Sequence, residues 1–166
     1  EGTLHNLGKY FILTDNINLS GHQWIPIGRS FSNQSQYFDG YFDGNRKIIT
    51  GLYVDESADG YVAGLFGTLL GQVHDLTIED AYVKTSGSNS SAGILAGKVS
   101  NPGTKITNCH VSGTVESDSV AGGLVGYSSY TEFEDCSAKA EVSATGNNIG
   151  GFIGEEIGRA SCRERV

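Results

Sequence analysis

The four histidines are the first residues to consider for chemistry, because histidine binds metals and exchanges protons near neutral pH. They are His5, His22, His74 and His110. A zinc peptidase would need two histidines four residues apart on a helix, with a glutamate beside the first. No two of these histidines have that spacing, and each lies in a stretch expected to be strand or loop. The sequence therefore predicts that this chain has no metallopeptidase centre. We expect the histidines to be structural or to face solvent.

Carboxylates could cleave polysaccharides, because such enzymes use paired Asp or Glu side chains at a defined separation. Most candidates here fall in turns or outward positions, where Asp-Gly simply makes a turn. Calcium would need an Asp-rich loop such as 55–59, but the spaced Asp-x-Asp-x-Asp-Gly pattern is absent. We predict no catalytic residue, no cofactor site and no metal site, with catalysis and calcium binding as alternatives. The carboxylate candidates are Asp39, Asp43, Asp55, Glu56, Asp59, Glu79, Asp80, Glu134 and Asp135.

Two of the three cysteines, Cys109 and Cys136, occupy the same place in a repeated pattern, one repeat apart. Stacked on neighbouring turns, their Cα atoms would lie about 4.8 Å apart, within the range of disulfide-bonded pairs. The sequence is therefore compatible with a disulfide bond between these two cysteines. Two buried free thiols are favoured, because cysteine packs well without being oxidised.

The composition excludes several classes of protein. Glycine provides 24 of the 166 residues, and the formal net charge is −8. The glycines do not recur at every third position as in collagen, and no stretch approaches the roughly 18 apolar residues of a membrane helix. The 11 Lys and Arg residues are scattered, whereas nucleic-acid binding needs them clustered. We therefore expect one folded domain with an acidic surface, no nucleic-acid partner and no membrane span.

A short glycine-bounded unit recurs along the chain. Its closing glycines lie about 28–30 residues apart, a period typical of repeat architectures. Between the units come an alternating strand, such as Val73–Ile78, and then a third short strand, such as Tyr82–Val83. The glycines are expected to supply positive φ angles and close approach between turns. The structural positions of this repeat are Gly64, Gly67, Gly97, Gly123, Gly126, Gly151, Gly154, Cys109 and Cys136.

Short strands that repeat at a fixed period predict an all-β fold, because each turn buries its apolar face only against its neighbours. The best fit is a right-handed parallel β-helix of about 28–30 residues per turn. The repeats are expected over about 46–156. Residues 1–45 are expected to form an aromatic-rich capping region, with strands at 10–13, 17–19 and 24–27 and with Trp24, Phe31, Phe38 and Phe42 as cap and core.

The segment 157–166 differs from the rest of the chain. Three of its ten residues are arginine, and it resembles the translated sequence of a sequencing-library adapter. We interpret it as a non-native tail. Residues 1–156 are interpreted as one domain from a longer chain whose neighbouring domains are missing, and whose signal peptide would precede Glu1.

The repeats resemble the GLUG-repeat family. The resemblance rests on the runs 19–28 and 38–54, on Gly64-Leu-Phe-Gly67, and on Ile106-Thr-Asn-Cys-His-Val111, and it spans roughly residues 10–155. That family occurs in secreted and cell-surface proteins, chiefly bacterial, among them adhesin-like chains and regions attached to IgA-specific zinc metallopeptidases. The resemblance implies a β-helical, extracellular, non-catalytic module without a cofactor.

We expect the protein to act as a rigid spacer or adhesin scaffold at the cell surface. We do not expect it to be an enzyme. Its partner would be a host or extracellular glycan, or a protein surface. The alternatives are a glycan-binding module, a polysaccharide-processing β-helix, and an accessory region of an IgA-specific metallopeptidase. A glycan-binding module would gather its exposed tyrosines on one surface, whereas a spacer would scatter them. The candidate contacts are Tyr53, Tyr61, Tyr127 and Tyr130.

Overall fold

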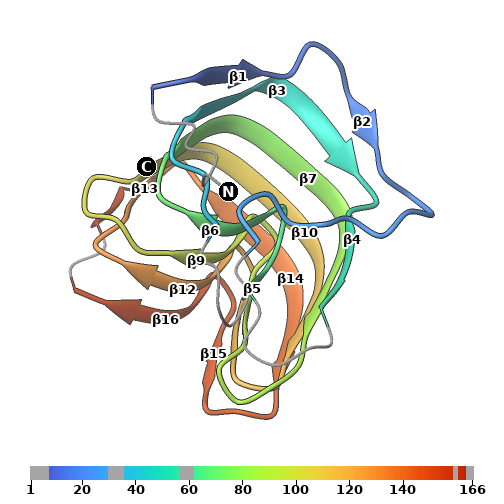
Figure 1. The fold of residues 1–166 in the computed structure, drawn as a ribbon, viewed down its shortest axis with the longest axis vertical. Helices are drawn as coiled ribbons and strands as arrows, with labels where there is room; N and C mark the ends of the chain where they lie inside the picture. The colour runs from blue at the N-terminus through green and yellow to red at the C-terminus, as the bar shows by residue number, and fades with distance from the viewer. Residues whose placement is uncertain (1–7, 30–35, 57–61, 159–160, 164–166) are drawn as a thin grey trace.

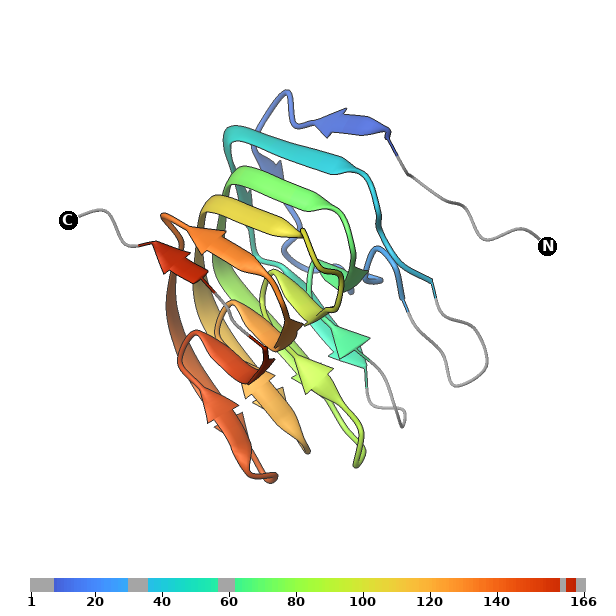
Figure 2. The same ribbon diagram turned by 90° about the vertical axis from the view of Figure 1, so that its left-hand side faces the viewer.

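The chain folds as a parallel β-solenoid. The computed structural model describes residues 8–29, 36–56, 62–158 and 161–163. Within these ranges every regular element is a strand, so none of them holds a helix able to cross a membrane. The strands pair in parallel and stack turn upon turn (Figures 1 and 2). The predicted parallel β-helix is confirmed, and its handedness stays a prediction.

Three sheets form the sides of the coil. The first contains β1 (Tyr10–Ile12), β2 (Ile17–Asn18), β3 (Tyr41–Thr50), β4 (Tyr53–Glu56), β7 (Gln72–Thr85), β10 (Lys105–Ser117), β13 (Glu132–Glu134), β14 (Ser137–Ala144) and β17 (Ser161–Arg163). The second contains β5 (Val62–Ala63), β8 (Ser91–Ala92), β11 (Val120–Gly122) and β15 (Asn148–Gly150). The third contains β6 (Phe66–Leu69), β9 (Ala96–Val99), β12 (Val125–Ser129) and β16 (Ile153–Ile157).

The register of the third sheet reproduces the sequence period. Thr68 pairs with Lys98, Lys98 with Tyr127, and Tyr127 with Glu155. Each of these four residues directly follows the closing glycine of a repeated unit. Each unit therefore contributes one turn, and equivalent residues of successive turns lie side by side.

Two details of the strand prediction are wrong. The segments Val73–Ile78 and Tyr82–Val83 belong to one long strand, β7, because the chain turns at Asp75 and Asp80 without leaving the ladder. Both residues have left-handed backbone, with φ of 55° and 53°. The predicted strand at 24–27 is reduced to isolated bridges at Gln23 and Ile27. Pro26 lies between them and has no N–H to donate to a ladder.

The core is one continuous apolar column inside the coil. Aromatic side chains fill its N-terminal end, where the ring centroid of Phe66 lies 5.1 Å from that of Phe38 and 5.5 Å from that of Phe42. Trp24 is half-buried, and its Nε1 donates to the carbonyl of Leu65 at 3.1 Å. Phe31 lies outside the described residues. The largest fully buried side chains are Phe66, Phe133, Leu52, Leu65, Leu69, Leu76, Ile78, Ile94, Leu95, Ile106, Leu124 and Val54.

The glycines of the repeat lie where neighbouring turns approach closely. A Cβ added at Gly97 would come within 2.6 Å of the Ala63 nitrogen, and one at Gly67 within 2.6 Å of the Gly28 oxygen. The expectation of positive φ is wrong, because none of the seven repeat glycines has it. Lack of space for a side chain is therefore what requires glycine at these two positions.

Candidate functional site

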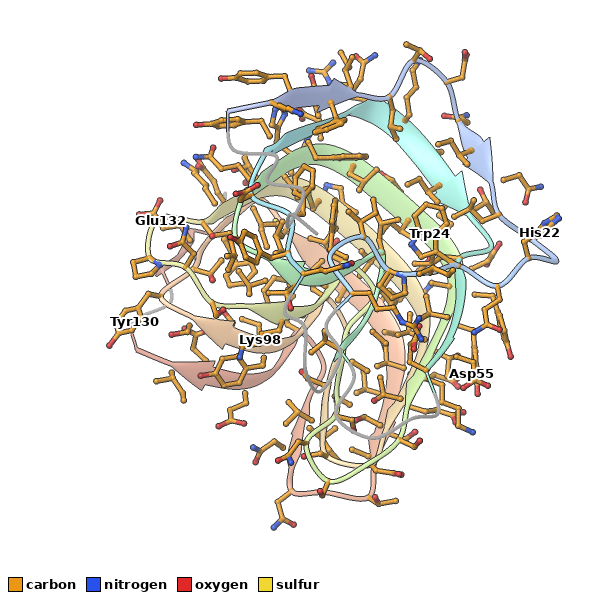
Figure 3. The ribbon with its side chains drawn as sticks, in the orientation of Figure 1. His22, Trp24, Asp55, Lys98, Tyr130 and Glu132 are labelled. Atoms are coloured by element: carbon orange, nitrogen blue, oxygen red, sulfur yellow. The ribbon has the colours of Figure 1, made fainter. Side chains whose placement is uncertain are left out.

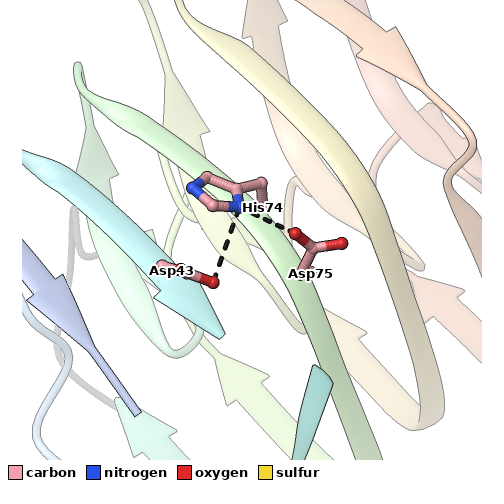
Figure 4. A group of neighbouring side chains, drawn as sticks. All are labelled: Asp43, His74 and Asp75. Carbon is pink, nitrogen blue, oxygen red and sulfur yellow. Dashed lines mark hydrogen bonds and ion pairs between the residues drawn. The ribbon is translucent and has the colours of Figure 1, made fainter. Parts of the chain in front are cut away.

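Three polar side chains meet on the first sheet: Asp43 of β3, and His74 and Asp75 of β7 (Figure 4). His74 Nδ1 lies 3.6 Å from Asp43 Oδ1 and 3.0 Å from Asp75 Oδ2. Asp43 and His74 are direct partners in the ladder, so their side chains share a face. Asp75 joins them because its left-handed backbone departs from the alternation of a regular strand. Their ligand atoms all lie within 4.8 Å of one another.

Hydrogen bonds continue from this cluster across two further turns. Asn108 Nδ2 donates to Asp75 Oδ1, and Asn108 Oδ1 lies 3.1 Å from His110 Nε2. His110 Nδ1 lies 2.8 Å from the hydroxyl of Ser137. We call Asp43, His74, Asp75, Asn108, His110 and Ser137 the polar ladder. The bond from Asn108, and then the bond from His74, lower the pKa of Asp75 because both stabilise its charged form.

One imidazole nitrogen and two carboxylate oxygens are ligand types that Zn²⁺ and Mn²⁺ accept. The three side chains are partly exposed, at 32–41%. Asn108 orients Asp75 from outside the set, as an outer partner does at metal sites. The cluster could hold a cation. The prediction of no metal site stays a prediction, and the calcium alternative at 55–59 falls mostly outside the described residues.

We expect Asp75 to contribute to stability in a pH-dependent way. Its folded pKa lies below the ordinary value of 3.8, so its contribution is present above that value and is lost as the pH falls through the folded pKa. Asp75→Asn keeps the shape and tolerates left-handed backbone. The melting-temperature gap between wild type and variant should be widest near neutral pH and should close as the pH falls below 3.8 and through the lowered folded pKa of Asp75.

Thermal melts between pH 2 and pH 7 test this expectation. Asp80→Asn is the matched control, because Asp80 also has left-handed backbone on β7 but lies outside the polar ladder. A gap that stays constant over the whole pH range for Asp75→Asn would contradict a role for its charge.

A cleft of about 450 Å³ lies between residues 20–23 and the two turns that carry Tyr53 and Tyr82. Tyr53 and Tyr82 stack beside it, with ring centroids 5.5 Å apart and planes at 12°, because they are direct ladder partners. Polar groups of Ser20, His22 and Asp80 also line the cleft. An aromatic surface next to hydrogen-bonding groups is a common arrangement in sites for small ligands.

The tyrosines predicted as ligand contacts are scattered. Tyr53 is 40% exposed at the cleft, whereas Tyr130 is 53% exposed and lies on the opposite side of the molecule from His22 (Figure 3). Tyr127 lies on the third sheet, with Lys98 Nζ 5.3 Å from its ring centroid. Tyr61 lies outside the described residues. Sequence reasoning missed Tyr82, although it follows Tyr53 by one repeat period and pairs with it.

Several carboxylates proposed as catalytic candidates are engaged in ion pairs. Glu56 is 3% exposed, and its Oε2 lies 2.6 Å from the guanidinium of Arg29. Glu134 Oε2 lies 2.9 Å from Nζ of Lys105 on the neighbouring turn. These contacts join separate segments of the coil, so they give both carboxylates a structural role.

The cysteines lie where the repeat places them. Cys109 is buried among the core residues and Cys136 is half-buried, and both are free thiols. A hydrogen bond between the two side chains, and then burial, raise the pKa of Cys109 well above its usual range. The same hydrogen bond lowers the pKa of Cys136.

Comparison with known proteins identifies the repeat. The model of the GLUG motif matches residues 117–143, which form one turn from the end of β10 into β14. The resemblance seen in the sequence is therefore confirmed.

Two curated proteins are similar to parts of the chain. A candidate Gly-rich membrane protein of Evansella cellulosilytica is 32% identical over 98 residues, which cover 54% of this chain and 11% of that protein. Halomucin of Haloquadratum walsbyi is 35% identical over 130 residues, which cover 72% of this chain and 1% of that protein. The chain thus spans only a small part of either relative.

A solved structure shares the fold. The crystal structure of a candidate immunoglobulin A1 protease from Bacteroides ovatus superposes with a TM-score of 0.65, over 95% of this chain and 58% of that one. The two sequences are 18% identical, so this likeness supports the fold alone.

Proposed function

Because the chain carries the GLUG motif within a parallel β-solenoid, we propose that it is a non-catalytic repeat module of an extracellular, cell-surface protein. Its role is that of a rigid scaffold that spaces or displays other parts of that protein. The observation that carries this proposal is the ladder Thr68, Lys98, Tyr127 and Glu155, in which every repeat stacks on the one before it.

The mechanism is geometric. Each turn adds about 4.8 Å of length, because that is the spacing of hydrogen-bonded strands. The apolar column is shared by successive turns, so bending the coil would open contacts on one side. Ion pairs such as Lys105 with Glu134 and Lys84 with Glu116 link neighbouring turns on the outside.

One relative is named as a membrane protein, which is consistent with a surface location for this module.

Rigidity is tested by backbone ¹⁵N relaxation. A scaffold should show uniformly high order parameters, about 0.85, for the residues of strands β3, β7, β10 and β14. Turns that move independently would give different values in successive repeats, and that result would overturn the scaffold proposal.

Location is tested on intact producing cells with a membrane-impermeant amine reagent. Lys139 of β14 is exposed, so a surface module should be labelled there without lysis. Labelling that appears only after lysis would place the module inside the cell and would contradict the proposal.

The cleft favours a second candidate function, carbohydrate binding. Sugar rings pack their C–H faces on aromatic side chains and hydrogen-bond to polar groups at the rim. Tyr53 offers such a face, and His22 and Asp80 line the same cleft. If the module binds a glycan there, Tyr53→Ala should weaken binding about tenfold, which corresponds to the roughly 1.4 kcal/mol that an aromatic contact contributes.

A glycan array with the wild-type protein and this variant is the measurement. Tyr130→Ala is the matched control, because Tyr130 is exposed but lies on the other side of the coil. Absence of glycan binding by the wild type would reject this candidate and leave the scaffold. An equal loss in both variants would show that the glycan does not bind at the cleft.

A further inference from the structure

We propose that Cys109 and Cys136 are a covalent modification site, at which a disulfide-containing oxidant joins two neighbouring turns through an intramolecular disulfide bond. The cross-link adds to the scaffold proposed above, but its chemistry does not depend on that function.

The register places the two cysteines directly opposite each other. Thr107 pairs with Glu134, and His110 pairs with Ser137. Cys109 and Cys136 lie between these pairs, so they are partners on adjacent parallel turns. Their Cα atoms are therefore about 4.8 Å apart, inside the range of roughly 4.4–6.8 Å that disulfides span. One turn earlier the partner of Cys109 is Leu76, so this ladder position holds a single pair of neighbouring thiols.

The two turns have the same local backbone, which directs both sulfurs alike. The residues before them, Asn108 and Asp135, have φ of 50° and 51°. Each thiol contacts the carbonyl two residues earlier at 3.3 Å, at Thr107 and at Glu134. The Cys136 thiol also contacts the carbonyl of Ile106 on the preceding turn at 3.3 Å. The Cys136 sulfur thus reaches toward the turn that carries Cys109.

Burial assigns different roles to the two thiols. Cys109 is fully buried, whereas Cys136 is half-buried and is the one that a solute can reach. The hydrogen bond from Cys109 lowers the pKa of Cys136 and so favours its thiolate, which is the nucleophile in disulfide exchange. Cys136 is therefore the attacking residue, and Cys109 resolves the intermediate.

The reaction proceeds in two exchanges. The Cys136 thiolate attacks one sulfur of oxidised glutathione, which forms a mixed disulfide and releases one glutathione thiolate. The Cys109 sulfur then attacks the Cys136 sulfur, and its proton passes to the glutathione sulfur that leaves as the mixed disulfide breaks. Two protein thiols are oxidised, and one glutathione disulfide is reduced to two molecules of glutathione.

Intact mass tests the proposal directly. The third cysteine is first removed by Cys162→Ser, and the folded, reduced protein is incubated with excess oxidised glutathione. We expect a loss of about 2 Da, the mass of two hydrogens, without dimer formation. Digestion after glutamate, which cuts at Glu116 between the two cysteines, should give one cross-linked pair of peptides. The melting temperature should rise by up to about 10 °C, because the disulfide closes a loop in the unfolded chain and so lowers the conformational entropy of the unfolded state.

Two variants and one labelling experiment make the test decisive. Cys136→Ser should show neither the mass loss nor the rise in melting temperature, and Cys109→Ser should stop at the mixed disulfide. Because a variant could fold poorly, native wild type is also treated with iodoacetamide, which should modify Cys136 before Cys109. An unchanged mass, a disulfide between two chains, or faster labelling of Cys109 would each overturn the proposal.

Discussion

Replacing Phe66 by alanine is expected to destabilise the protein by about 3–5 kcal/mol. Phe66 is fully buried and belongs to the aromatic group that joins the N-terminal segment to the repeats. Its ladder partner on the next turn is the small Ala96, so a large and a small side chain share the space between these turns. The hydrogen-bonded ladder holds the turns in place, so the cavity left by the ring cannot close.

Urea unfolding followed by circular dichroism measures this loss as a lower midpoint with an unchanged slope. Phe66→Leu is the control, because it keeps most of the apolar volume and should cost less than about 1.5 kcal/mol. Equal midpoints for Phe66→Ala and the wild type would show that this region is not packed as described.

Gly97→Ala is expected to destabilise the protein by about 1–3 kcal/mol, the usual cost of adding atoms to a packed region, although alanine is generally preferred to glycine within strands. The new Cβ would lie 2.6 Å from the nitrogen of Ala63 and 2.8 Å from the oxygen of Ser91. Both are backbone atoms of hydrogen-bonded strands, so they cannot move aside as the end of a side chain can. The turns themselves would have to separate.

Gly151→Ala provides the matched control. Gly151 is the opening glycine of a later copy of the repeated unit, and no atom beyond its chain neighbours lies within 4 Å of the position that its Cβ would occupy. Its replacement should be neutral or slightly stabilising, because alanine restricts the unfolded chain. Comparable losses of melting temperature in the two variants would contradict close approach as the reason for glycine at position 97.

Much of the coil could be predicted from the sequence, because the same residue types recur at a fixed spacing wherever successive turns stack. The glycine spacing predicted the register of the third sheet, and Cys109 and Cys136 lie between paired residues of neighbouring turns, as their shared place in the repeat predicted. The second sheet was missed. Its strands are two or three residues long, as in Ser91–Ala92, and such segments have no detectable alternation.

The polar ladder and the cleft were harder to predict, because neither follows the period of the repeat. Asp43 pairs with His74, but the next pair along β3 and β7 is Lys47 with Leu76, so β3 uses more residues than β7 between the two pairs. This irregularity shifts the register, so the glycine period does not bring Asp43 and His74 together. The cleft depends on residues 20–23, which precede the first repeat and follow no period.

Distances between spin labels along the third sheet test the stacked scaffold most directly. In a variant whose three cysteines are replaced by serine, labels are placed in pairs at Thr68 with Lys98, with Tyr127, and with Glu155. Stacked turns predict narrow separations that increase by about 4.8 Å with each turn. Broad distributions, or separations that do not increase from one pair to the next, would contradict the stacked solenoid and the scaffold function based on it.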